Sequence, residues 1–127
     1  MTLQALKFIN DRLEAAGLNY HFDRYNYGTG SPVYPYHVGT YKEHDAENED
    51  GGQETTFTIN SWARGVRLDL EKDKAKIKAA FPVYGLSHVF PDGSGIVVSY
   101  RRSQPIPTGD TELKRMETIL NVKEWSV

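Results

Sequence analysis

Four histidines are the side chains best suited to acid–base or metal chemistry, and they stand at positions His21, His37, His44 and His88. A metal site needs converging ligands, typically at an HxxxH or HxH spacing, and none of these histidines is paired in that way. The nearest pair, His37 and His44, is seven residues apart, with Asp45 beside the second. Three of the four alternate with apolar residues, which predicts histidines on the solvent side of strands. We therefore expect no catalytic and no metal-binding histidine.

The segment 43–54 is the most polar part of the chain. Its acidic residues are Glu43, Asp45, Glu47, Glu49, Asp50 and Glu54. Asp45, Glu47 and Glu49 match positions 1, 3 and 5 of a calcium-binding loop. However, Asp50 stands where such a loop needs Gly, and Thr56 stands where it needs a bidentate Glu. The pattern therefore predicts a flexible acidic loop, or a contact arm for a neighbouring chain, rather than a calcium site.

Two Gly-rich segments also fail as sites. Residues 28–31 are followed by Pro32 rather than by the helix that a phosphate-binding loop needs. Ser94 lies between two glycines but lacks the spacing of a nucleophile elbow and has no placed base. An enzyme needs a nucleophile or a base with an orienting partner, and we find no such pair. The sequence therefore predicts no catalytic residue and no enzyme activity.

Tyrosines and arginines are the better candidates for a binding surface. Six of the eight tyrosines crowd into residues 20–41. Each buried tyrosine hydroxyl needs a partner, and tyrosine is enriched in protein interfaces. Tyr34 and Tyr36 therefore belong either to an assembly interface or to an aromatic sheet face of a monomer. Arg101 and Arg102 could clamp a polyanion beside Tyr100, although the pattern favours an exposed strand end.

Length and composition limit the classes of protein that fit. The chain has 127 residues, which suits a single domain over 1–127, with 39% hydrophobic and 25% charged residues. There is no Cys, so disulfides, thiolate nucleophiles and Cys-based metal sites are excluded. The net charge of −2 gives no overall electrostatic case for nucleic-acid binding. No apolar run approaches the length of about 20 residues that spans a membrane, and no signal-peptide pattern opens the chain, so we expect synthesis inside the cell.

Hydrophobic periodicity predicts two helices and several strands. The predicted elements are a helix over 2–16, strands over 18–27, 33–41 and 55–62, a helix over 69–81, and a hairpin of 83–90 with 96–102. Segments 28–32 and 103–109 read as loops. Residues 111–126 fit a helix and a strand equally well. Strands joined as hairpins with two helices predict an α+β fold, an antiparallel or mixed β-sheet with both helices packed on one face and 43–54 as a long flexible loop.

Two strand segments carry a family resemblance. Residues 33–39 read VYPYHVG, an acidic loop follows, and residues 50–64 read DGGQETTFTINSWAR. This order resembles the tail terminator and tail completion proteins of long-tailed bacteriophages, in which a YPYVV-type strand leads through an acidic loop to a GxExTFTIxxWxR-type strand. The predicted first helix, the chain length and the lack of Cys agree with that family.

The resemblance implies a structural virion protein without enzyme activity or cofactor. Such proteins form a ring, usually a hexamer, on the head-proximal end of the tail tube. The ring stops tube polymerisation and joins the head–tail connector, and DNA passes through its lumen without specific binding. The implied partners are further copies of the chain, the tail-tube protein and a connector or neck protein. The protein would be made in the host bacterial cytoplasm and located in the virion tail, with no membrane contact, and 111–126 would be a strand.

The acidic residues of 43–54, together with Tyr34, Tyr36, Arg101 and Arg102, are then the expected interface residues. Two other classes of function stay open on the sequence. One is a small enzyme or ligand-binding domain with a cleft lined by tyrosine and histidine. The other is a nucleic-acid-binding module that uses Arg101, Arg102 and the tyrosines.

Overall fold

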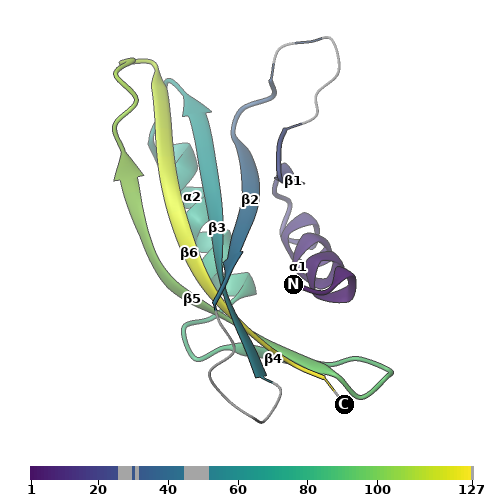
Figure 1. The fold of residues 1–127 in the computed structure, drawn as a ribbon. Coiled ribbons are helices and arrows are strands. Elements are labelled where there is room, and N and C mark those ends of the chain that lie inside the picture. The colour runs from purple at the N-terminus through teal and green to yellow at the C-terminus, as the bar shows by residue number, and fades with distance from the viewer. Residues whose placement is uncertain (26–29, 31, 45–51, 127) are drawn as a thin grey trace.

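A six-stranded mixed β-sheet with two α-helices forms the fold (Figure 1). The computed structural model describes residues 1–25, 30, 32–44 and 52–126. Its elements are α1 (Leu3–Ala15), β1 (Tyr20–Phe22), β2 (Tyr36–Glu43), β3 (Gly52–Arg64), α2 (Leu68–Ala80), β4 (Leu86–Val89), β5 (Gly95–Ile106) and β6 (Leu113–Trp125). The strand order is β1-β2-β3-β6-β5-β4, with β1 parallel to β2 and the other pairs antiparallel. The predicted α+β class is confirmed.

Helix α1 forms where the sequence predicted it. The side chain of Thr2 caps its first turn by accepting a hydrogen bond from the backbone N–H of Ala5. Gly17 follows the helix with a φ of +84°, which favours glycine. Ile9 and Leu13 are fully buried, whereas Leu3, predicted on the same face, is 86% exposed because it lies in the first turn, beyond the core.

The core lies between the helices and one face of the two central strands. Strands β3 and β6 are 13 residues long and pair from Gly52 and Trp125 at one end to Arg64 and Leu113 at the other. The side chains of Phe57 on β3 and Leu120 on β6 are fully buried in one cluster with residues of both helices. Because alternate residues of a strand face opposite sides, the residues between these lie on the other face, the open sheet face, where most are partly exposed. The implied strand over 111–126 is confirmed.

Several strand boundaries differ from the prediction. In the described part of the predicted strand 18–27, residues 18–25, only β1 is strand, because Asp23 turns the chain at a φ of 72°. The predicted strand 33–41 begins only at Tyr36, after Pro35, which has no N–H to donate. Strands β2 and β3 extend into the predicted loop 43–54, and its middle, 45–51, lies outside the described residues. Strand β5 continues through Pro105, since β4 covers its outer edge only as far as Val98.

Candidate functional site

Tyr34 and Tyr36 lie in an aromatic cluster at one end of the open sheet face. The rings of Tyr36 and Trp62 stack with centroids 5.1 Å apart, and Tyr34 lies 5.3 Å from Tyr36. The guanidinium groups of Arg64 and Arg115 lie over the rings of Tyr34 and Trp62, each 5.4 Å from the centroid. The two tyrosines are partly buried. Their contacts with neighbouring rings account for much of the tyrosine crowding within the monomer itself.

Of the acidic residues predicted at the interface, the structure describes Glu43 and Glu54, and it brings neither together with these tyrosines. Glu43 and Glu54 lie at the far ends of β2 and β3, and Glu43 contacts the amino group of Met1. Asp45, Glu47, Glu49 and Asp50 lie outside the described residues. These four predicted interface residues are therefore not included in the site described below.

Arg101 and Arg102 stand on the outer edge of β5. The pairing of β5 with β6 skips Arg101, because Tyr100 faces Leu120 and Arg102 faces Ile119. This β-bulge redirects the strand locally and turns side chains outward. Both arginines are exposed, and neither has a hydrogen bond or ion pair with the part of the chain that the structure describes. The predicted exposure of this pair is confirmed, whereas the predicted strand end is wrong, because β5 continues to Ile106.

A buried polar network was missed by the sequence analysis. Nδ1 of His37 lies 2.5 Å from Oγ of Ser61, and Nε2 lies 2.8 Å from Oδ2 of Asp73. Because a carboxylate only accepts, Nε2 carries a proton and donates it to Asp73, and in the neutral ring Nδ1 accepts from the Ser61 hydroxyl. The exposed fractions are 1% for His37, 3% for Ser61 and 8% for Asp73. The prediction of a solvent-facing strand histidine is wrong for His37.

The network has the residue types of a serine hydrolase triad but not its arrangement. In such a triad Nε2 faces the serine and Nδ1 faces the aspartate, which is the reverse of the contacts of His37. Ser61 is also buried, so a substrate carbonyl cannot approach its Oγ in this structure. His37 and Ser61 are opposite one another on β2 and β3, and Asp73 lies on α2. The network therefore holds α2 against the sheet.

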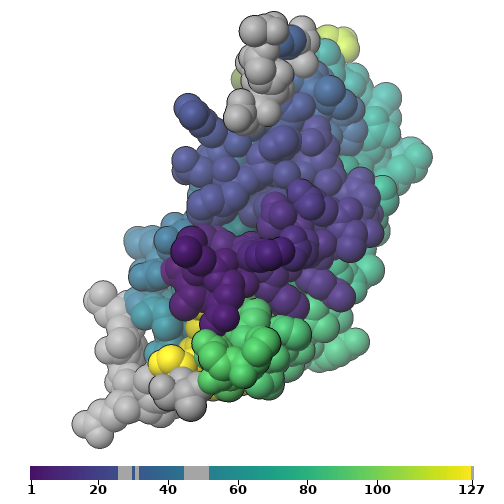
Figure 2. All heavy atoms as spheres, turned by 90° about the vertical axis from the view of Figure 1, so that its right-hand side faces the viewer, coloured from purple at the N-terminus to yellow at the C-terminus, as the bar shows by residue number. Residues whose placement is uncertain are grey.

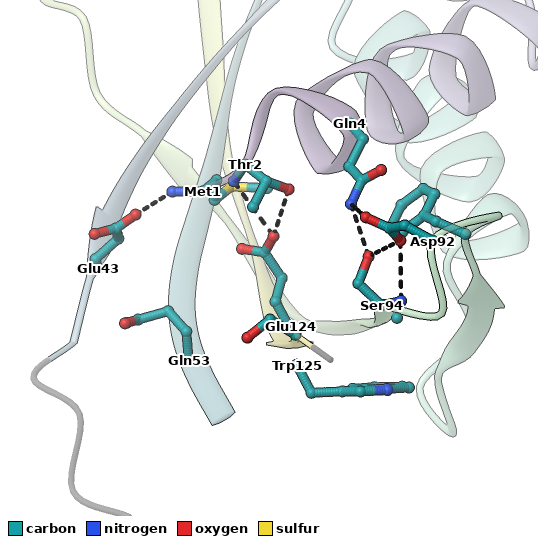
Figure 3. Close-up of a pocket in the computed structure, with 12 residues that line it drawn as sticks. Met1, Thr2, Gln4, Glu43, Gln53, Asp92, Ser94, Glu124 and Trp125 are labelled. Atoms are coloured by element: carbon teal, nitrogen blue, oxygen red, sulfur yellow. Dashed lines mark hydrogen bonds and ion pairs between the residues drawn. The ribbon is translucent and has the colours of Figure 1, made fainter. Parts of the chain in front are cut away.

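A cavity of about 630 Å³ opens at the N-terminal end of α1 (Figure 3). It lies where this end of the helix, the β4–β5 turn and the C-terminal end of β6 meet, low on the face shown in Figure 2. Three carboxylates line it, those of Glu43, Asp92 and Glu124, and Trp125 forms an aromatic wall. We call this cavity with its three carboxylates and Trp125 the acidic pocket.

Glu124 is the most buried carboxylate of the acidic pocket, with 7% of the residue exposed. Its Oε1 accepts hydrogen bonds from the hydroxyl of Thr2 at 2.8 Å and from the backbone N–H of Thr2 at 3.3 Å. Its other oxygen has no hydrogen bond from the described residues, and no described Lys or Arg pairs with it. This oxygen is not among the fully buried side-chain atoms that lack a partner, so it is open to the pocket, where it can accept a further hydrogen bond.

Hydrogen bonds fix the rim of the acidic pocket. The hydroxyl of Ser94 donates to Asp92 Oδ1 at 2.5 Å, and the backbone N–H of Ser94 donates to the same oxygen at 3.0 Å. These bonds stabilise the ionised form and hold the pKa of Asp92 below its ordinary value. Gln4 of α1 donates to Ser94 Oγ at 2.7 Å. A Cβ atom on residue 95 would overlap the indole of Trp125, so Gly95 allows the ring to pack directly against the backbone of β5.

The described residues offer no evidence for a resident metal. In that part of the chain no three His, Cys, Asp or Glu side chains are grouped so that they could hold an ion. The helices described here are too short and too polar for any of them to cross a membrane.

The fold is shared with solved structures. A chain from the virion of a native gene transfer agent particle superposes with a TM-score of 0.69 over 93% of this chain and 92% of that one, at 13% identity. A second solved chain superposes with a TM-score of 0.69 over 100% of this chain and 98% of that one, at 16% identity. No family model and no curated protein matches the sequence. At these identities the comparisons show that this chain has the same fold, over nearly its whole length, as a component of a phage-like particle.

Proposed function

We propose that this chain is a structural subunit of a phage-like virion, and that it forms a ring on the head-proximal end of a tail tube. In this role the ring ends tube polymerisation and presents the surface to which the head–tail connector attaches. The observation that carries the proposal is the end-to-end match of fold with a chain of a gene transfer agent virion. The sequence resemblance of residues 33–64 to tail terminator proteins adds the position in the tail.

The absence of enzyme activity is part of this proposal. One group of described residues has the side-chain types of a catalytic triad, namely Ser61, His37 and Asp73. These residues are buried and are hydrogen-bonded to one another. Their hydrogen bonds are used to join β2, β3 and α2, so this set of residues is not free to act on a substrate. A ring subunit needs surface rather than a reactive site, and this division between a closed core and open sheet edges suits that need.

Ring formation requires two different surfaces on each subunit, because a head-to-tail contact repeated by rotation closes on itself. Six copies would form the ring, the tail-tube protein would bind one side and a connector protein the other. DNA would pass through the lumen without specific binding. A near-neutral chain with a net charge of −2 tolerates such close packing of copies.

Assembly in the presence of the tube tests the proposed function. The purified chain would be mixed with polymerising tail-tube protein of the same particle and imaged by electron microscopy. Tubes that end in a ring and stop growing support the proposal. Tubes that grow to the same length distribution with and without the chain contradict it.

A further inference from the structure

We propose that the acidic pocket is a socket for an arginine side chain of a neighbouring copy of this chain, and that Arg101 and Arg102 supply it. This inference rests on the proposed function, since it assigns the contact that would join adjacent subunits of the ring. It concerns residues that nothing in the fold comparison identifies.

The chemistry of the pocket selects a planar cation. Guanidinium groups bind carboxylates through two parallel N–H donors and also stack on aromatic faces. The pocket presents both kinds of partner, with carboxylates at Glu43, Asp92 and Glu124 and the indole of Trp125 on its wall. None of the described residues that line it is Lys or Arg.

Glu124 is a carboxylate of the pocket that has no ion pair among the described residues. It is more than nine-tenths buried, and only one of its two oxygens is hydrogen-bonded within the described residues. In Figure 3 the second oxygen points into the pocket, on the side of Glu43. The cationic group among the described lining residues is the α-ammonium of Met1, which pairs with Glu43, so a single positive charge faces three carboxylates. A guanidinium group from another copy would offset the negative charge that is left.

Arg101 and Arg102 are the complementary feature on the same chain. Both are exposed on the bulged outer edge of β5, and the described residues give them no ionic partner. They cannot fill the pocket of their own subunit. Arg101 stands six residues along β5 from Gly95 at the pocket, which is roughly 20 Å at about 3.3 Å per residue. The arginine pair and the pocket are therefore two distinct surfaces, as a head-to-tail contact between copies requires.

A peptide titration tests the socket without any need for a ring. A synthetic peptide with the sequence of residues 97–106 would be added to the full chain, and the indole N–H signal of Trp125 followed by NMR, assigned with Trp125→Phe. We expect saturable movement of this signal, and binding weakened at least about tenfold when both arginines of the peptide are alanine. Equal binding of the two peptides, or no movement of the Trp125 signal, would overturn the inference.

Assembly of variants tests the same contact between whole chains. Arg101→Glu/Arg102→Glu removes the arginine pair, which we call the plug. Glu124→Gln removes the negative charge of residue 124 in the socket, while its side-chain oxygen can still accept a hydrogen bond from Thr2. Each variant alone should stay monomeric under conditions in which the parent chain forms rings. When the two variants are mixed in equal amounts, they should form dimers only. The arginine pair of the Glu124→Gln chain can enter the intact pocket of the arginine variant, but the other two surfaces of this dimer are defective and bind no further copy.

Two controls keep these results interpretable. Arg12→Ala removes another exposed arginine, on α1, and should form rings as the parent does. Asp92→Asn alters the pocket at an exposed position and should weaken assembly even if Glu124→Gln fails to fold, which circular dichroism would reveal. Rings that form normally from the plug and socket variants refute the socket but leave the proposed function standing. Peptide binding to a parent chain that never forms rings refutes the proposed function but leaves the socket standing.

Discussion

Nε2 of His37 lies 2.8 Å from Oδ2 of Asp73, and this buried contact joins the sheet to helix α2. The ring is oriented on its other side by Ser61, which faces it across the β2–β3 pair. A polar group in a core is expensive unless its hydrogen bonds are satisfied, and here both ring nitrogens have partners. The network therefore specifies how α2 sits on the sheet, which apolar contacts alone leave less defined.

Replacement of His37 should destabilise the fold strongly. His37→Ala removes the hydrogen-bond partner of the buried Ser61 and Asp73, and leaves Asp73 only its ion pair with Lys76 at 3.6 Å. We therefore expect a loss of about 2–4 kcal/mol in the free energy of unfolding. Urea denaturation followed by circular dichroism measures it. His44→Ala, at an exposed histidine, should change the free energy of unfolding by less than about 0.5 kcal/mol. Equal stability of the two variants would contradict the structural role of the network.

Gly39 should tolerate no side chain. A Cβ atom there would overlap the hydroxyl of Tyr20 and lie 2.7 Å from Cζ of Phe57. Both rings are buried, so they have little room to shift, and Gly39→Ala should cost about 1–3 kcal/mol. Thermal unfolding measures the effect. Gly30→Ala is the matched control, because no atom lies within 4 Å of its Cβ position. A Gly39→Ala protein as stable as that control would show that the packing here is looser.

The sequence predicts the elements that bury a regular stripe and is less reliable at their ends. Helix α1 and strand β3 were predicted because Ile9 and Leu13, and Phe57 and Ile59, recur at the period of a helix and a strand. Segment 111–126 was ambiguous because its apolar residues satisfy both periods. The pairing of β6 with β3 along its whole length settles it as a strand, and that pairing is a tertiary contact that no local pattern contains.

The candidate site was harder to predict, because its residues come from separate parts of the chain. Asp73 follows Leu70 by three residues on the buried stripe of α2, and a carboxylate on such a stripe was an available signal for a buried partner. The pairing of His37 with Ser61 depends on the register of β2 and β3. Glu124 belonged to the ambiguous segment, so its burial could not be inferred. By contrast, the exposure of Arg101 and Arg102 was predicted correctly from the sequence.

The rim of the acidic pocket should show a measurable pH signature. Hydrogen bonds from Ser94 hold the pKa of Asp92 below its ordinary value. A carboxyl group with a lowered pKa in the folded state contributes stability above its unfolded pKa, and this contribution is lost as the pH falls through the folded pKa. Ser94→Ala removes the hydroxyl donor and keeps the backbone N–H, so it should raise the pKa of Asp92 and reduce that part of the acid dependence. An NMR titration of the Asp92 carboxyl measures it, and an unchanged pKa in Ser94→Ala would contradict the assignment.

The acidic segment should act in assembly rather than in folding. Glu47→Gln/Glu49→Gln/Asp50→Asn neutralises three carboxylates that lie outside the described residues. If the segment is a contact arm or an acidic rim that repels DNA, this variant changes ring assembly or DNA passage and keeps a melting temperature close to that of the parent chain. Differential scanning calorimetry and an assembly assay measure the two effects. A large fall in melting temperature would contradict a role of this segment in assembly rather than in folding.

The most direct test of a ring-forming virion subunit is its oligomeric mass, with and without its template. Native mass spectrometry would be recorded on the purified chain alone and after mixing with polymerising tail-tube protein, with electron micrographs of the same samples. The proposed function predicts a closed ring, six copies in mass, alone or on one end of each tube. A chain that stays monomeric in both samples and leaves the tubes uncapped would contradict it.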